Sequence, residues 1–175
     1  MSLANTSAYS AQVATLVQQL KLKPHPEGGF YTESYRAVDQ VKRLADGAVR
    51  ASSTAIYYLL NNGAYSAWHR IASDEAWHFY AGSPLNVHVL TPEGELLTHR
   101  LGPALEQEGC VYQAVVPAGC WFGAELVNPD SFALVGCTVA PGFEFSEFEL
   151  ASASALLSAY PQHETTIRRL LPAGT

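Results

Sequence analysis

The sequence predicts an all-β barrel or jelly roll with a short N-terminal helix and further helices near its C-terminal end. Two observations support this fold class. Between residues 30 and 149, short runs rich in β-branched and aromatic residues alternate with turn residues, and apolar residues recur at helical spacing only near the two ends. No long helical pattern separates the strand-like runs, so parallel strands joined by crossover helices are not expected. Closely spaced short strands are typical of a sandwich or barrel.

Helices are expected only at the two ends of the chain. In residues 10–20 the apolar positions follow helical spacing, at Val13, Leu16, Val17 and Leu20. The pattern ends before residues 23–26, where two prolines forbid continuation of a helix. Near the other end, residues 151–160 and 163–171 predict two short helices, which Pro161 separates.

The strands are predicted from runs that end directly at turn residues. Four such runs are residues 54–60 before Asn61-Asn62-Gly63, 85–90 before Pro92-Glu93-Gly94, 111–116 before Pro117-Ala118-Gly119, and 132–139 before Pro141-Gly142. At 175 residues the chain is long enough for one domain with a sizeable core and too short to favour two. We therefore expect a single domain over residues 1–175, with its barrel core at about residues 25–150.

Composition and charge narrow the function classes. The chain is 48% hydrophobic and 15% charged, as expected of a folded globule. Its net charge of −6, with no compensating basic run, opposes nucleic-acid binding. There is no apolar run of roughly 20 residues for a membrane span and no secretory signal in residues 1–10. The three cysteines lack CxxC spacing, so we expect reduced thiols and a cytoplasmic protein.

One segment, residues 63–82, carries a recognisable spacing of glycine, histidine and glutamate. Its landmarks, at intervals of six, six and seven residues, are Gly63, His69, Glu75 and Gly82. This spacing resembles the first motif of the cupin superfamily, in which a second histidine stands two places after the first; Ile71 occupies that place. The turn at residues 117–119 resembles that of the second cupin motif. The departures from that second motif are Val111 at its opening glycine, Phe122 at its histidine and Leu126 at its asparagine.

Three further segments narrow the resemblance. They are His25-Pro26-Glu27-Gly28-Gly29-Phe30-Tyr31, Ser73-Asp74-Glu75-Ala76-Trp77-His78-Phe79-Tyr80 and Ala140-Pro141-Gly142-Phe143-Glu144-Phe145. Together they resemble the hallmarks of an uncharacterised cupin subfamily, DUF985 or Cupin_5, over roughly residues 20–161. The resemblance implies the cupin double-stranded β-helix, an RmlC-like jelly-roll barrel, and carries no established activity. The Glu27-Gly28-Gly29 turn is expected to need glycine for positive φ.

Because alternate side chains of a strand face the same way, the motifs predict which residues face the barrel interior. We expect His69 with Ile71, Glu75 with Trp77 and Phe79, and Cys120 with Phe122 to point inward, and Arg70 and His78 outward. Tyr31, Glu33 and Tyr35 share one strand face, which lines either the pocket mouth or a subunit interface. The candidate ligand-binding residues are His69, Glu75, Trp77, Phe79, Cys120, Phe122, Tyr31, Glu33 and Tyr35. Such a mostly apolar pocket with a few polar groups suits a small organic ligand, for example a sugar-like one.

The chemistry of this pocket is open between three interpretations. The first is metal-free acid–base chemistry, as in an epimerase or isomerase, with His69 as base and Glu75 orienting it. In that case Tyr31, Tyr57 or Tyr80 supplies the acid, by analogy with cupin epimerases that use a histidine and a tyrosine.

The second interpretation is a metal-dependent oxygenase or isomerase, and the third is a non-catalytic module in which His69 and Glu75 form a structural pair. Cupins usually bind a divalent transition metal through three histidines and one glutamate, a set of which only His69 and Glu75 remain. Cys120 could add a third ligand, although the superfamily does not use that position. We therefore expect much less than one equivalent of metal. A homodimer is expected because exposed sheet edges need cover and the strand at residues 30–35 is aromatic.

Overall fold

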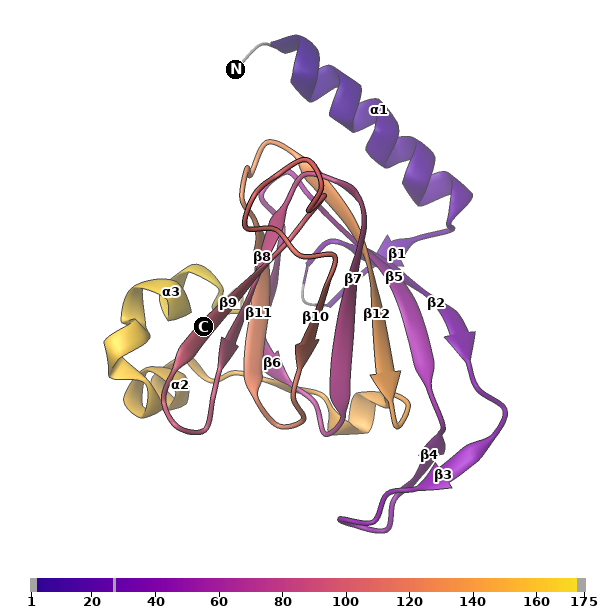
Figure 1. Cartoon of the computed structure of the whole chain (residues 1–175), viewed down its shortest axis with the longest axis vertical. Helices are drawn as coiled ribbons and strands as arrows, with labels where there is room; N and C mark the ends of the chain where they lie inside the picture. The colour runs from indigo at the N-terminus through magenta and orange to yellow at the C-terminus, as the bar shows by residue number, and fades with distance from the viewer. Residues whose placement is uncertain (1–2, 27, 173–175) are drawn as a thin grey trace.

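The computed structural model describes residues 3–26 and 28–172 and shows two antiparallel sheets that face each other as a barrel (Figure 1). One sheet has the strand order β1 (Lys23–Pro24), β2 (Phe30–Arg36), β5 (Thr54–Asn61), β12 (Phe132–Ala140), β7 (Asp74–Gly82), β10 (Gln113–Val116). The other has the order β13 (Glu149–Leu150), β6 (Tyr65–Arg70), β11 (Trp121–Leu126), β8 (Leu85–Leu90), β9 (Leu96–Leu101). Neighbouring strands are mostly distant in sequence, as in a jelly roll, so the predicted fold class is confirmed.

A small hairpin extends away from the barrel at its lower end in Figure 1. It consists of β3 (Gln40–Lys42) and β4 (Val49–Ala51), which pair only with each other. Several apolar side chains are exposed on the two strands of this hairpin and on the loops next to them. They are Val38, Val41, Leu44 and Val49.

The N-terminal helix α1 (Leu3–Gln19) begins seven residues earlier than predicted. Apolar spacing indicates only the part of this helix that packs on the barrel. Val13, Leu16 and Val17 contact the buried cluster of the first sheet, which contains Leu59 and Leu134. The N-terminal part of α1 projects beyond the strands (Figure 1).

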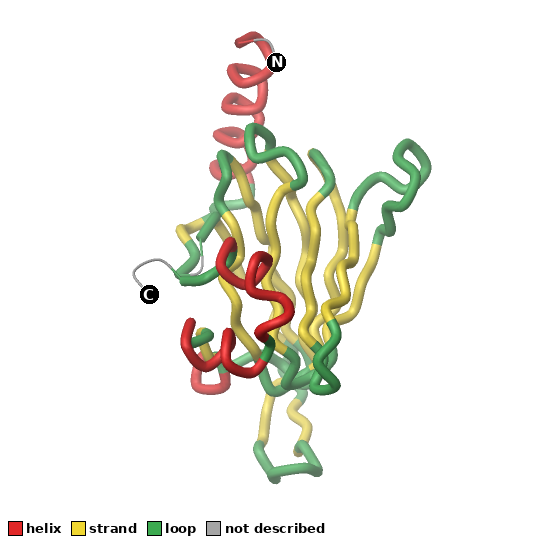
Figure 2. The backbone as a smooth tube through the Cα atoms, turned by 90° about the vertical axis from the view of Figure 1, so that its left-hand side faces the viewer, coloured by secondary structure: helices red, strands yellow, loops and turns green. Residues whose placement is uncertain are grey.

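The predicted C-terminal helices are confirmed, with slightly shorter bounds. They are α2 (Ala153–Ala159) and α3 (Glu164–Arg169), joined by the 3-10 turn η2 (Pro161–His163). Both helices lie against the outer face of the second sheet (Figure 2), over a buried cluster that includes Trp68 and Ile167. In the described part of the chain no helix is long and apolar enough to cross a membrane.

The main core fills the space between the two sheets. Its members come from both sheets and include Trp77, Phe122, Val135 and Leu85. Residues of this core form one wall of a cavity. A second 3-10 turn, η1 (Phe145–Glu147), helps to enclose the cavity.

Candidate functional site

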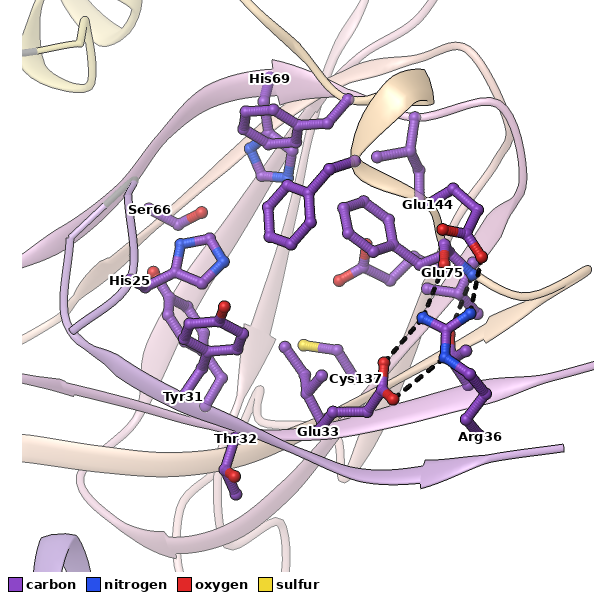
Figure 3. A pocket seen from close by; sticks show the side chains of 18 of the residues that line it. His25, Tyr31, Thr32, Glu33, Arg36, Ser66, His69, Glu75, Cys137 and Glu144 are labelled. Carbon is purple, nitrogen blue, oxygen red and sulfur yellow. Dashed lines mark hydrogen bonds and ion pairs between the residues drawn. The ribbon is translucent and has the colours of Figure 1, made fainter. Parts of the chain in front are cut away.

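A cavity of about 430 Å³ opens between β2 and β5 on one side and β6 on the other (Figure 3). The three sequence segments that carry the subfamily hallmarks all contribute to its lining. Their contributions are His25 and Tyr31 from the first, Glu75 and Trp77 from the second, and Phe143, Glu144 and Phe145 from the third. Segments more than 40 residues apart in the sequence therefore meet at one cavity, which makes it the candidate functional site.

His69 reaches the cavity from β6 and is only 4% exposed. Its Nδ1 lies 2.7 Å from the carbonyl oxygen of Ala67. A carbonyl only accepts hydrogen bonds, so Nδ1 donates and Nε2 is the unprotonated nitrogen of the neutral ring. Burial lowers the pKa of His69 to about 3, so the ring is neutral at physiological pH.

Glu75 reaches the cavity from β7, in the opposite sheet. Burial raises the pKa of its carboxyl group to about 7, and a hydrogen bond with the thiol of Cys137 opposes this shift. Within the described residues no hydrogen bond or ion pair joins His69 to Glu75. The expected histidine–carboxylate pair is therefore not formed. The two strands leave their shared turn for different sheets, so the side chains enter the cavity from different walls (Figure 3).

His25 was not predicted as a site residue, yet it lines the cavity beside Tyr31. Its ring packs edge-on against Tyr31, with ring centroids 4.5 Å apart, and against Tyr58 at 5.3 Å. Burial lowers the pKa of His25 to about 4, so this second imidazole is also neutral. The sequence signal that could have identified His25 is its position as the first residue of the hallmark segment that ends in Tyr31.

The glycines that follow His25 confirm the expected backbone requirement. Gly28 and Gly29 have φ of 114° and 71°. A Cβ atom on Gly28 would lie 2.5 Å from the carbonyl oxygen of Tyr65. No other residue fits there without moving the backbone. Glu27, the other member of this turn, lies outside the described residues.

A β-bulge in β2 decides which residues of that strand line the cavity. The pairing of β2 with β5 shifts register between Glu33 and Tyr35, so two residues of β2 oppose one of β5. Tyr31 and Glu33 line the cavity, whereas Tyr35 is 55% exposed and lies outside the described lining. The prediction that Tyr35 shares their face is therefore wrong. Arg36 takes the inward position instead, and sequence analysis missed it.

Arg36 joins two carboxylates at the exposed mouth of the cavity (Figure 3). Its Nε and Nη2 donate to the two oxygens of Glu33 at 3.0 and 2.8 Å, and its Nη1 donates to Glu144 Oε1 at 2.7 Å. Nη2 also donates to the carbonyl oxygen of Phe143 at 3.2 Å. The mouth is therefore a charged cluster with one cation and two anions that are already paired.

Residues 143–148, here called the roof segment, close one side of the cavity. Phe143, Phe145 and Phe148 form a mutual aromatic cluster, and the Phe148 ring centroid lies 5.3 Å from that of His69. Glu147 in the same segment forms ion pairs with Arg43 and Arg50 of the β3–β4 region. The roof segment is therefore fixed to the barrel by apolar contacts and to the β3–β4 hairpin by ion pairs.

The remaining predicted residues support the cavity rather than line it. Phe122 is fully buried, and the centroid of its ring lies 4.0 Å from that of His69 and 6.4 Å from that of Trp77. Cys120 belongs to the same core at 6% exposure. Phe79 packs at the edge of the core and also borders a shallow hollow on the outer side. As expected, His78 faces that outer side.

The described residues do not fit a metal site of the usual cupin kind. Among them, no three histidine, cysteine, aspartate or glutamate side chains lie close enough together to hold a metal ion. Ile71 lines the cavity and Phe122 lies behind it, at the two positions where the cupin motifs have histidines. His69 and Glu75 alone fall short of the three protein ligands that a catalytic zinc site uses.

Comparison with known proteins identifies relatives of the whole domain. The family model Cupin_5, described as cupin superfamily (DUF985), matches residues 14–151. A hypothetical protein from Leishmania major is 33% identical, with a TM-score of 0.83 and coverage of 91% of this chain and 98% of that one. A protein from Shewanella oneidensis is 43% identical, with a TM-score of 0.80 and coverage of 90% and 95%.

A more distant match shares the fold alone. Oxalate decarboxylase from Bacillus subtilis is 13% identical with a TM-score of 0.53, and the match covers 84% of this chain and 36% of that one. No functionally curated protein matches the chain.

Proposed function

The chain belongs to the Cupin_5 family of the cupin superfamily, and on this premise we propose that its cavity binds a small, neutral organic molecule with several hydroxyl groups, such as a sugar-like compound. The observation that carries the proposal is the convergence of the three hallmark segments on one cavity whose polar groups are mostly uncharged. Both lining imidazoles are neutral at pH 7 because burial lowers their pKa values.

The distribution of charge favours a neutral ligand over an anion. Of the described lining residues, the cations are Lys23, which is exposed, and Arg36, which is engaged by Glu33 and Glu144. The inner part of the cavity therefore offers no free positive charge to a carboxylate. The Bacillus enzyme, by its name, acts on the dianion oxalate, and this cavity lacks the positive charge that such a substrate needs for burial.

The apolar walls suit a ligand with C–H faces. Tyr31, Phe143 and Phe148 line the cavity with accessible aromatic surface, and His25, His69 and Glu75 supply polar groups. A sugar-like molecule presents both kinds of surface, because its ring hydrogens pack on aromatic faces while its hydroxyl groups form hydrogen bonds.

To test this proposal, thermal unfolding is measured at pH 7 with neutral monosaccharides and with organic dianions of similar size. A ligand that binds only the folded state raises the melting temperature, and we expect a shift from at least one sugar and none from the dianions. Tyr31→Phe should reduce that shift. Tyr35→Phe, the same change on the outward face of the same strand, is the matched control and should keep it. A shift from dianions alone, or equal losses in both variants, contradicts the proposal.

Glu75 favours a second candidate function, metal-free acid–base isomerisation in the same cavity. A carboxyl group whose pKa is about 7 is suited to proton transfer at neutral pH, whereas His69, with a pKa of about 3, is a weak base. The proton-transfer role predicted for His69 is therefore reassigned to Glu75. Among the three tyrosines considered as its acid partner, Tyr31 lines the cavity, and Tyr57 and Tyr80 lie outside the described lining.

If the protein turns its ligand over, the stabilising sugar should incorporate deuterium next to its carbonyl group in D2O. Nuclear magnetic resonance of the recovered sugar measures this exchange. Glu75→Gln should abolish it while the thermal shift remains, because glutamine keeps the shape of the side chain and cannot exchange a proton. Exchange at the parental rate in Glu75→Gln excludes Glu75 from this role. Absence of exchange in the parent leaves a binding function alone.

A further inference from the structure

The roof segment is attached to the barrel by backbone hydrogen bonds at its two ends and by side chains between them. At its start the N–H of Gly142 donates to the carbonyl oxygen of Ala51 at 2.8 Å, and the N–H of Phe143 donates to the hydroxyl oxygen of Thr54 at 3.0 Å. At its end β13 pairs with β6. Among the described residues, the backbone groups of residues 144–148 form hydrogen bonds only with each other. A segment held in this way can open locally while the rest of the fold persists.

The two sides of the roof segment carry different chemistry. Its three phenylalanines, Phe143, Phe145 and Phe148, belong to the lining of the cavity. Glu147 lies outside the described lining and forms its ion pairs with arginines of the β3–β4 hairpin. The segment therefore covers the cavity with apolar surface and is held from outside by charge.

The ion pairs that hold the roof segment differ in burial. Arg36 and Glu144 join β2 to the segment across the mouth (Figure 3), with side chains 38% and 43% exposed, and such exposed pairs contribute little. The side chains of Glu147, Arg43 and Arg50 are only 13–18% exposed. Loss of one partner there leaves charges that water does not fully reach, so these pairs are more costly to break. Glu147 is therefore the main polar attachment of the segment.

The β3–β4 hairpin is in turn attached to the barrel through one of these arginines. Its two strands pair only with each other. Arg43, in the hairpin turn, donates from Nη1 to the carbonyl oxygen of Ala72 at 3.2 Å, between β6 and β7, and also forms the ion pair with Glu147. One guanidinium thus joins the hairpin, the barrel and the roof segment.

We propose that the roof segment is a lid of the cavity and that the ion pairs of Glu147 with Arg43 and Arg50 keep it closed. Opening breaks these pairs and the pair of Arg36 with Glu144, and it moves residues 144–148 while the hydrogen bonds at both ends of the segment remain. The β3–β4 hairpin then serves to carry the two arginines that hold the lid. This inference concerns access to the cavity and goes beyond the proposed function, because it does not depend on which molecule binds.

The thiol of Cys137 provides a probe of lid opening. Cys137 lines the cavity, its sulfur points into the cavity (Figure 3), and the residue is only 3% exposed. Iodoacetamide, a small neutral reagent, therefore reaches this sulfur only after an opening. Cys120 belongs to the main core outside the described lining and reports on other openings. Mass spectrometry of peptides gives the alkylation rate of each thiol in the same sample at pH 8.

The first measurement uses the parent protein and needs no variant. The alkylation rate of Cys137 is followed at low urea concentrations and compared with global unfolding in urea. We expect the rate to depend on urea much more weakly than global unfolding does, because opening a short lid exposes little surface. Equal dependence would mean that the cavity opens only when the barrel unfolds, which overturns the inference.

The second measurement compares Glu147→Gln with Glu149→Gln. Glu149 lies in β13, outside the roof segment, and is also ion-paired with an arginine, Arg70, at 2.8 Å. Glu147→Gln should raise the alkylation rate of Cys137 at least tenfold and leave that of Cys120 unchanged, whereas Glu149→Gln should keep both rates.

A third variant, Arg43→Gln, tests the ion pair from its other side. It should also raise the Cys137 rate, and combining it with Glu147→Gln should add little, because both changes break the same ion pair. An unchanged Cys137 rate in Glu147→Gln overturns the inference, and so does an equal rise for Cys137 and Cys120, which indicates general loosening. None of these measurements includes a sugar, so their failure leaves the proposed ligand class standing. Absence of sugar binding rejects that ligand class and leaves the lid untouched.

Discussion

Two regions of this barrel bring together the same three residue types, a histidine, a glutamate and a tryptophan, with opposite results. In the region beneath α3 they are His88, Glu125 and Trp68, and in the cavity they are His69, Glu75 and Trp77. In the first set His88 and Glu125 are hydrogen-bonded to each other. In the second set no hydrogen bond between described residues joins His69 to Glu75.

The set beneath α3 forms a closed network. His88 Nε2 donates to Glu125 at 3.1 Å, and its Nδ1 lies 2.9 Å from the hydroxyl oxygen of Thr98. Glu125 also accepts from Arg169 of α3 at 2.7 Å. The hydrogen bond from His88, aided by Arg169, lowers the pKa of Glu125 to about 2. The hydrogen bonds from Arg169 to Glu125 and from Trp68 to Ile167 attach α3 to the sheet.

The cavity set behaves differently because burial, and not pairing, dominates its titration. The pKa of Glu75 rises, that of His69 falls, and Trp77 keeps an unused donor. Titratable groups whose pKa values are shifted by burial, and that lie at a cavity, are candidates for a binding or catalytic site. A histidine and a glutamate in one fold are thus a structural pair in one place and candidate functional groups in another.

The largest expected effect is the difference in stability when the glutamate of each set is replaced by leucine. Glu125→Leu should lower the free energy of unfolding by about 2–4 kcal/mol, because it leaves His88 and Arg169 without their shared partner. Glu75→Leu should leave stability unchanged or raise it, since it removes a buried carboxyl group whose partner is a weakly donating thiol. Urea denaturation of both variants at pH 7 measures the difference.

The double change His69→Leu with Glu75→Leu extends the comparison. We expect it to fold with roughly parental stability and to lose the ligand-induced thermal shift. A double variant that does not fold, or that still binds, means that the site is misplaced. A loss of stability in Glu75→Leu as large as that in Glu125→Leu removes the distinction between the two regions.

The contrast also shows what the sequence can predict. Local patterns were sufficient for the strands, since residues 85–90 match β8 and residues 132–139 match all but one residue of β12. They were sufficient for the inward positions of His69, Ile71, Glu75 and Trp77, because alternation within a strand is a local property.

Features that depend on pairing between strands were not predictable in this way. The bulge that places Arg36 instead of Tyr35 at the cavity depends on how β2 pairs with β5. The separation of His69 from Glu75 arises from the assignment of β6 and β7 to different sheets. The structural pair, His88 with Glu125, joins residues 37 positions apart, and no motif marks it.

The smallest expected effect is a difference in pH dependence between the parent and Glu75→Gln. The folded protein holds the Glu75 proton up to about pH 7, whereas the unfolded chain releases it near the ordinary value of 4.5. Between these values the folded state binds more protons, so this group lowers the free energy of unfolding as pH rises, by up to about 1.4 kcal/mol per pH unit. His25 and His69 have lowered pKa values and act in the opposite direction, raising stability as pH rises to about 6.5.

Both histidines are present in the parent and in Glu75→Gln, so their contributions cancel when the stabilities of the two proteins are compared, and the decrease due to Glu75 remains. Chemical denaturation at pH 6, 7 and 8 should therefore show Glu75→Gln gaining about 1 kcal/mol on the parent between pH 6 and pH 7, and little more above it. Glu125→Gln is the matched control, because a pKa of about 2 places its titration far below this range. Its stability should be lower than that of the parent by a constant amount at all three pH values. Parallel curves for the parent and Glu75→Gln would mean that Glu75 is already ionised in the folded cavity, and the raised pKa that makes it the candidate proton-transfer group would then be absent.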